Sequence, residues 1–229
     1  DNLKEMAECM IKLIGKSGVI IIEIQYLLNT LKDLSFDNIY HEHYNYWSLT
    51  SLTNFFKKLN VKIFKAEKIN THGGSLRIFI SKNKNIKISE SITKILKEEE
   101  NFGIKKFDTY KKFGEKINKL KENVINNIDK IKSKNRFLIG YGAPAKATTA
   151  LNFFGISNEI NYIIEDNKLK HNKFIPGVNI KIVSNTKLRE KNPLIIVMAW
   201  NFINEIRSKY PELKNQFISI KDLQNEPSN

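Results

Sequence analysis

The chain lacks the residues that hold together small secreted or metal-bound proteins. Cys9 is the one cysteine among 229 residues, which excludes an internal disulfide and a cysteine-rich zinc site. No apolar run approaches the roughly 18 residues of a membrane span, and residues 1–14 lack the pattern of a signal peptide. We therefore expect a cytoplasmic protein with no membrane partner and no metal in this chain.

Arginine-rich stripes and nucleic-acid recognition motifs are also missing, although the chain is strongly basic. Lys and Arg number 38 against 24 Asp and Glu, for a net charge of +14. The lysines are spread along the whole sequence, so we expect no specific nucleic-acid partner. A smaller phosphorylated ligand stays open, because basic charge attracts phosphate. A nucleic-acid-associated protein is a further alternative, which a steep salt dependence of oligonucleotide binding would support.

The first third of the chain has a mixed pattern. Apolar spacing predicts a helix over 3–14, and the run at 18–24 is typical of a strand buried on both faces of a parallel sheet. A capped helix follows to about Leu59, and 61–69 with 75–81 predict an antiparallel hairpin. This is too little sheet for a stable α/β layer, so the region resembles the second half of a larger domain.

The rest of the chain divides into a helical part and an alternating part. Residues 86–134 contain no proline and predict two helices, the second one long. Between 136 and 220 strands alternate with helices, and this order predicts a doubly wound parallel sheet.

Histidines gather in two short segments. The sequence Tyr40-His41-Glu42-His43 supplies a base that titrates near neutral pH, a carboxylate to orient it and a phenol donor. His72 precedes two glycines at the tip of the expected hairpin. Two alternatives stay open: the side chains cap turns, or His41, His43 and His72 bind zinc, although the helical spacing of zinc ligands is missing.

The turn at 140–146 links a strand to a helix through small residues. Such a turn presents backbone amides and a helix N-terminus to an anion, and Lys146 adds a positive charge. Ala145 stands where the dinucleotide fingerprint has its third glycine, so the pattern predicts a ligand turn and no particular cofactor. Glu165 and Asp166 close the next strand, where an acidic residue would meet a ribose.

Five segments in a fixed order carry a family resemblance. They are FDNIYHEHYNYWSL (36–49), THGGSLR (71–77), GYGAPAKATTALNFFGI (140–156), EDNKLKHNKFIPGVNIKI (165–182) and MAWNFINEI (198–206). Together they resemble the S-adenosylmethionine-dependent sugar C-methyltransferases, which methylate carbon 3 of nucleotide-linked 4-keto-deoxysugars. The likeness runs from about residue 3 to about residue 220.

The resemblance implies an α/β fold in which a partial class I methyltransferase sheet is followed by a helical connection and a Rossmann-like doubly wound domain. Residues 1–85 are similar to the C-terminal half of the methyltransferase domain, 86–134 to the helical connection and 135–229 to the Rossmann-like, substrate-binding C-terminal domain. The zinc module of full-length relatives and the glycine-rich donor loop have no counterpart in this chain. We therefore expect a C-terminal fragment or a degenerate form, with zinc absent from this chain and the S-adenosylmethionine site mostly upstream.

The same resemblance implies roles for individual residues. The family's sugar site is lined by residues that match Tyr40, Glu42 and His43, with His43 as the favoured base, and His72 matches another pocket-lining position. The expected substrate-binding residues of the C-terminal domain are Tyr141, Gly142, Lys146 and Glu165. The function expected from this set is methyl transfer to a nucleotide-linked keto-deoxysugar. The alternative is a nucleotide-sugar-binding module without catalysis.

Overall fold

The computed structural model describes residues 2–71, 73–134, 136–189 and 192–226. Contacts divide the chain into two compact units. We call Asp1–Ser35 with Tyr44–Phe113 the first unit, and Phe36–His43 with Gly114–Asn229 the second unit. The short segment Phe36–His43 therefore belongs with the C-terminal half of the chain. It lies between two stretches of sequence that both belong to the first unit.

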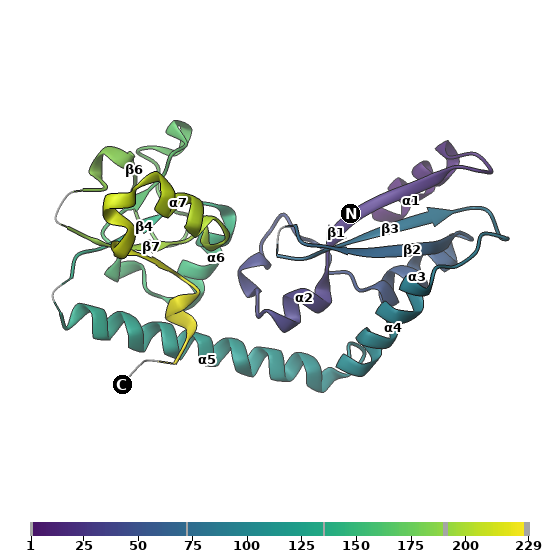
Figure 1. The fold of residues 1–229 in the computed structure, drawn as a ribbon, viewed down its shortest axis with the longest axis horizontal. Helices are drawn as coiled ribbons and strands as arrows, with labels where there is room; N and C mark the ends of the chain where they lie inside the picture. Colours follow the sequence, from purple (N-terminus) through teal and green to yellow (C-terminus); the bar gives the residue numbers. More distant parts are fainter. Residues whose placement is uncertain (1, 72, 135, 190–191, 227–229) are drawn as a thin grey trace. The chain divides into compact units, whose positions relative to one another are not determined.

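The first unit is a three-stranded antiparallel sheet with helices (Figure 1). Its elements are α1 (Leu3–Leu13), β1 (Val19–Gln25), α2 (Leu27–Lys32), α3 (Leu49–Lys58), β2 (Lys62–Ile69), β3 (Ser75–Ser81) and α4 (Glu90–Phe102), and α5 (Phe107–Lys132) begins here. The sheet order is β1-β3-β2, and α3 and α4 lie next to β2 in Figure 1. The predicted hairpin at 61–69 and 75–81 is confirmed.

The strand predicted for the apolar run at 18–24 is confirmed, but the predicted burial on both faces of a parallel sheet is wrong. β1 pairs antiparallel with β3 along one edge, and no other strand among the described residues joins it. Its side chains alternate, so that Ile20 is buried whereas Val19 and Ile21 are 42% and 59% exposed. The run is apolar on both faces of the strand, but only one face of this sheet is covered.

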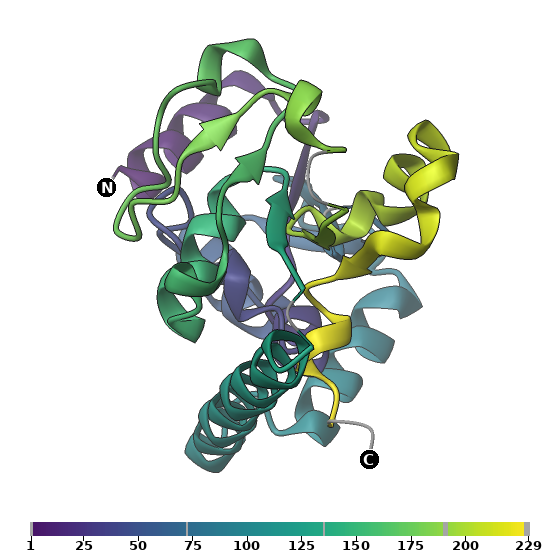
Figure 2. The same cartoon turned by 90° about the vertical axis from the view of Figure 1, so that its left-hand side faces the viewer.

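The second unit is built on a parallel sheet of five strands (Figure 2). Its elements are β4 (Leu138–Tyr141), α6 (Ala145–Phe154), β5 (Ile163–Ile164), β6 (Ile182–Val183), β7 (Leu194–Val197), α7 (Ile203–Lys209) and β8 (Phe217–Ser219), together with the greater part of α5. The order β6-β5-β4-β7-β8 places the first strand of the unit in the centre. All four pairings are parallel, which confirms the sheet predicted for 136–220.

β4 lies in the centre of the sheet and the strands are parallel, so the carboxyl end of the sheet is the expected place for a binding site. From β4 the chain moves to β5 and β6 on one side, and β7 and β8 lie on the other side. At such a reversal the loops after the two middle strands diverge and leave a crevice beyond their carboxyl ends. The turn at 140–146 follows β4, and Trp200 follows β7, so both lie at this end.

Local sequence explains some of the helix boundaries. Ser48 caps α3 in a capping box with Ser51, which confirms the capped helix predicted to end near Leu59. Gly155 ends α6 in the left-handed conformation with φ +71°. The sequence pattern does not predict α2 and β6, which are short elements of six and two residues. Its domain boundaries at residues 85 and 134 stay a prediction, and they differ from the division that the contacts make.

Candidate active site

The segment that carries the predicted base is folded onto the second unit through aromatic packing. Phe36 begins a single 3-10 turn, Phe36–Asn38, in which all three residues are buried. Its ring centroid lies 4.8 Å from that of Phe153 and 5.3 Å from that of Phe154, both at the end of α6. This contact fixes the start of the 36–43 segment on the parallel-sheet unit.

Tyr40 and His43 form a hydrogen-bonded pair at the end of this segment. The Tyr40 hydroxyl lies 3.0 Å from Nε2 of His43, and the two ring centroids are 4.6 Å apart. Both side chains are partly buried, whereas Glu42 and His41 are exposed. Burial, followed by the charges of Glu42 and Asp37, raises the pKa of the Tyr40 phenol. The Tyr40 phenol is therefore held in its protonated form beside His43.

Three of the four predicted catalytic residues thus lie in one segment. Tyr40, Glu42 and His43 belong to the second unit, and Tyr40 pairs with His43. Their catalytic roles stay predictions. His72 lies outside the described residues, so its place in the site stays a prediction. The glycine at position 74 is required by the structure. Gly74 has φ +108°, and a Cβ there would lie 2.0 Å from the side chain of Asn29.

The turn after β4 is closed by a carboxylate of its own chain. Glu165 Oε2 accepts a hydrogen bond from the backbone N–H of Ala143 at 2.9 Å, and its Oε1 accepts one from Asn167 N. Lys170 Nζ donates to the carbonyl of Ala143 at 2.8 Å. The Ala143 amide, which the sequence suggested for an anionic ligand, therefore already has an anionic partner. The role of Glu165 in substrate binding stays a prediction, and its described contacts brace the turn.

Tyr141 and Gly142 also serve the architecture of this end of the sheet. The Tyr141 ring is buried against Tyr210 and Phe217, and its hydroxyl donates to Asp166 Oδ2 at 2.9 Å. Burial, followed by the contacts with Tyr210 and Asp166, raises the pKa of this phenol. Gly142 has φ +90°, and a Cβ there would lie 3.3 Å from Ala199, in the loop after β7. Substrate binding by these two residues stays a prediction.

Lys146 is the predicted binding residue that has a suitable chemical setting. It lies in the first turn of α6, and its ammonium group is 5.1 Å from the centre of the Trp200 ring. Lys221 Nζ lies at the same distance from that ring. Two cations therefore meet on one indole at the carboxyl end of the parallel sheet, where an anionic group would be attracted.

Asp37 connects the Trp200 cluster to the Tyr40–His43 pair. Its Oδ2 accepts a hydrogen bond from Nε1 of Trp200 at 3.1 Å. The sequence pattern assigns no role to Asp37, Trp200 or Lys221, although Asp37 and Trp200 stand inside the segments 36–49 and 198–206. A pairing across 163 positions leaves no local pattern, so only the fold shows it.

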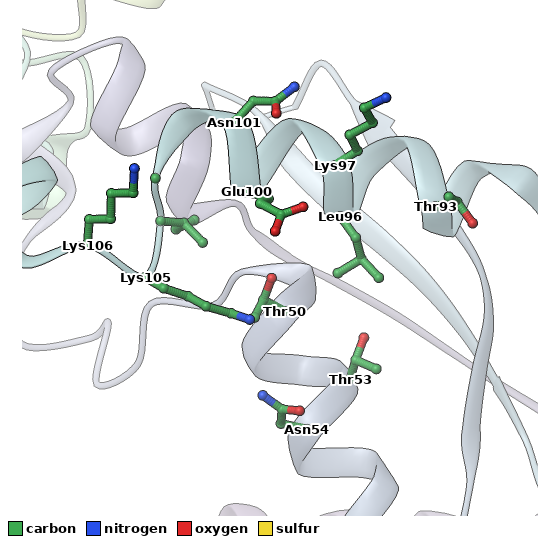
Figure 3. A pocket seen from close by; sticks show the side chains of 12 residues that line it. Thr50, Thr53, Asn54, Thr93, Leu96, Lys97, Glu100, Asn101, Lys105 and Lys106 are labelled. Carbon is green, nitrogen blue, oxygen red and sulfur yellow. The ribbon is translucent and has the colours of Figure 1, made fainter.

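A cavity in the first unit contains none of these residues. It has a volume of about 700 Å³ and is lined by α3, α4 and the loop that follows. Figure 3 shows Leu96 and Glu100 of α4 facing Thr50 and Thr53 of α3. No residue predicted to be functional lines it. Among the described residues no three His, Cys, Asp or Glu side chains come together as metal ligands, and none of the helices there is long and apolar enough to cross a bilayer.

Two comparisons with known proteins bear on this site. Residues 70–219 match a family model described as the C-methyltransferase C-terminal domain. The chain is also 27% identical over 208 residues to C-methyltransferase NovU of Streptomyces niveus. The match covers 90% of this chain and 50% of NovU, so the chain spans about half the length of that curated relative.

Proposed function

Because the chain belongs to the C-methyltransferase C-terminal domain family, we propose that it supplies the acceptor side of a C-methyltransferase reaction. In this proposal it binds a nucleotide-linked keto-deoxysugar and removes the proton from carbon 3, next to the ketone. The observation that carries the proposal is the Tyr40–His43 pair, which belongs to the same unit as the parallel sheet.

The residues of the pair suit this proton transfer. A hydrogen on a carbon next to a ketone is weakly acidic, and its removal needs a base and a donor for the enolate oxygen. In the structure the Tyr40 hydroxyl lies within hydrogen-bond distance of Nε2 of His43, and in this proposal the phenol donates to that nitrogen. When a ketone takes the phenol's hydrogen bond, the Nε2 lone pair is released and accepts the carbon-bound proton. The electron pair of the broken C–H bond moves into the enolate, which Tyr40 stabilises, and Glu42 balances the imidazolium charge.

Lys146 and Lys221 offer a place for the anionic part of such a substrate. A nucleotide-linked sugar carries a diphosphate, and both ammonium groups lie at the carboxyl end of the parallel sheet. The Ala143 amide is already bonded to Glu165, so in this proposal the lysine side chains provide the contacts. The net charge of +14 favours capture of an anion of this kind.

A methyl donor has no recognisable site in the described part of the first unit. β1 runs directly into Tyr26 and α2, and no glycine-rich turn follows it. Family chemistry points to S-adenosylmethionine, which supplies an electrophilic methyl group when bound. Because the described residues do not fit that donor, the steps proposed for this chain end at the enolate.

Hydrogen exchange tests the proposal without any methyl donor. In deuterated buffer, NMR of a nucleotide-linked 4-keto-deoxysugar should show deuterium entering at carbon 3 in the presence of the protein. His43→Asn should slow this exchange by about 10²- to 10⁴-fold, the usual contribution of a general base. His41→Asn is the matched control, because His41 is exposed in the same segment, and it should keep the wild-type rate.

The alternatives give different results in the same assay. If His43→Asn exchanges as fast as the wild type, His43 is not the base and another residue removes the proton. Binding of the nucleotide-sugar with no exchange by the wild type would support a binding module without catalysis. If the wild type neither binds the nucleotide-sugar nor catalyses exchange, the proposed substrate is contradicted.

A further inference from the structure

We infer that Asp37 is a positioning residue, which acts through Trp200 to hold the Tyr40–His43 pair at the carboxyl end of the parallel sheet. The inference rests on the proposed function for its catalytic consequence. Its structural part, the Asp37–Trp200 link, is independent of that function. Nothing in the sequence pattern assigned a role to either residue.

Asp37 is buried without the partners that a structural carboxylate normally has. Asp37 is only 6% exposed, and its Oδ1 has no hydrogen-bond partner among the described residues. Other short polar residues of this unit cap their own 3-10 turns, as Asn167 does for Leu169 N and Ser184 for Thr186 N. Asp37 makes no such cap, and its recorded hydrogen bond goes to Trp200. A buried acceptor that is left half unsatisfied is costly and calls for an explanation beyond local stability.

Trp200 is the point where three parts of the second unit meet. It begins the 3-10 turn that comes shortly after β7, and its indole Nε1 donates to Asp37 of the 36–43 segment. The ammonium groups of Lys146, from α6, and Lys221, from the loop after β8, lie 5.1 Å from its ring centre. An anion bound by these lysines would therefore act on the ring that holds Asp37.

Asp37 also acts on Tyr40, three residues further along the segment. The titratable groups recorded near Tyr40 in the described structure are Asp37, Glu42, His41 and His43. The negative charges of Asp37 and Glu42 favour the protonated phenol, which is the form that can donate to a ketone oxygen. One carboxylate thus fixes the segment to Trp200 and keeps its phenol a donor.

The activity test compares Asp37→Asn with Asp33→Asn, a nearby exposed aspartate of the first unit. Asp37→Asn should lower kcat for carbon 3 exchange by about 10- to 100-fold, since misplaced catalytic groups lose rate at this scale. KM should change little. The alkaline limb of the pH profile should also move to lower pH, because the phenol loses a neighbouring negative charge. Asp33→Asn should match the wild type. A uniform loss of rate with no shift of the profile would indicate a merely structural role and overturn the inference.

Trp200→Phe provides a second, independent variant. It keeps an aromatic ring but removes the N–H donor, and Trp47→Phe is the matched control in the first unit. If Asp37 acts through Trp200, the double variant Asp37→Asn with Trp200→Phe should lose no more rate than the more affected single variant. Losses that multiply would show two separate roles and contradict the coupling.

A fluorescence measurement separates this inference from the proposed function. Trp47→Phe leaves Trp200 as the one tryptophan of the chain. In that background Asp37→Asn should shift the Trp200 emission, whereas Asp33→Asn should not. An unchanged emission would overturn the inference. If the wild type shows no exchange but the emission shifts, the proposed function fails while the Asp37–Trp200 link stands.

Discussion

Glu99 in the first unit and Asp37 in the second are both buried carboxylates, and their surroundings are opposite. Glu99 is 0% exposed and accepts four hydrogen bonds, from Leu49 N, Thr50 N, Thr50 Oγ1 and the Tyr26 hydroxyl. Asp37 accepts one, from Trp200, and its other oxygen has no partner in the described structure. The first carboxylate completes the N-terminus of α3, as a structural group should. The second carboxylate has fewer hydrogen-bond donors than it can accept from, which is the property expected of a group that serves a reaction.

Removing Glu99 should have the largest effect on stability. Glu99→Ala takes a charged acceptor from several buried donors at once, and we expect a loss of about 3 to 5 kcal/mol in the free energy of unfolding. Urea unfolding followed by Trp47 fluorescence in a Trp200→Phe background measures this. The neighbour Glu100→Ala is the control, because Glu100 is exposed, and it should stay within about 0.5 kcal/mol. Equal midpoints for the two variants would show that the α3 cap does not depend on Glu99.

High pH should weaken the Glu99 site through Tyr26. Burial, followed by the charge of Glu99, raises the pKa of the Tyr26 phenol. The unfolded chain releases this proton above about pH 10, whereas the folded chain keeps it. The stabilisation is therefore complete below that pH and is lost as the pH rises further.

Tyr26→Phe tests this dependence. It should flatten the alkaline decline of the urea midpoint, although it costs about 1 to 2 kcal/mol at neutral pH by removing the hydrogen bond. Tyr44→Phe, at an exposed phenol, should leave the slope unchanged. The same slope in both variants would assign the decline to other groups.

Replacing Asp37 should cost little stability, in contrast to Glu99. Asp37→Asn removes a buried charge that has a single recorded donor, and we expect a change of less than about 1 kcal/mol in the free energy of unfolding. Trp200 fluorescence in a Trp47→Phe background follows the unfolding. A loss as large as that of Glu99→Ala would place Asp37 among the structural carboxylates and remove the contrast.

Glu98, the neighbour of Glu99, should show the smallest effect. It pairs with Lys32 and Lys68, and hydrogen bonds from these two lysines lower the pKa of its carboxyl. The side chain is about one-third exposed, so solvent screens the pairs. Glu98→Gln should cost less than about 1 kcal/mol, and the difference should vanish in concentrated salt. A difference that persists at high salt would mean that the contacts are not mainly electrostatic.

The fold could be predicted where each element follows from its own residues. Ser48 and Ser51 predict the start of α3, and the apolar run at 193–200 predicts the strand β7. The environment of β1 could not be predicted in this way. Its apolar run is compatible with burial on both faces, and exposure of Ile21 depends on which strands and helices surround it.

The candidate site was predictable in part for the same reason. Tyr40 and His43 are three positions apart, so their pairing has a local pattern. Asp37 and Trp200 are chemically ordinary where they stand, and their contact exists only because the 36–43 segment packs on the parallel-sheet unit. Glu165 shows the reverse case. Its position after a strand suggested a ribose ligand, while its carboxylate is engaged by the turn beside it.

The two edges of the antiparallel sheet carry very different protection against self-association. β2 presents Lys62, Lys65 and Lys68 and has a register irregularity between Ile63 and Lys65. Lysines and bulges are the devices by which sheet edges repel a second chain. β1 has the sequence VIIIEIQ, with no lysine and no proline, and its outer edge pairs with no strand in the described residues. In the described chain β1 is therefore the edge more open to another strand, and Ile21→Lys should reduce pairing between copies of this chain at high concentration.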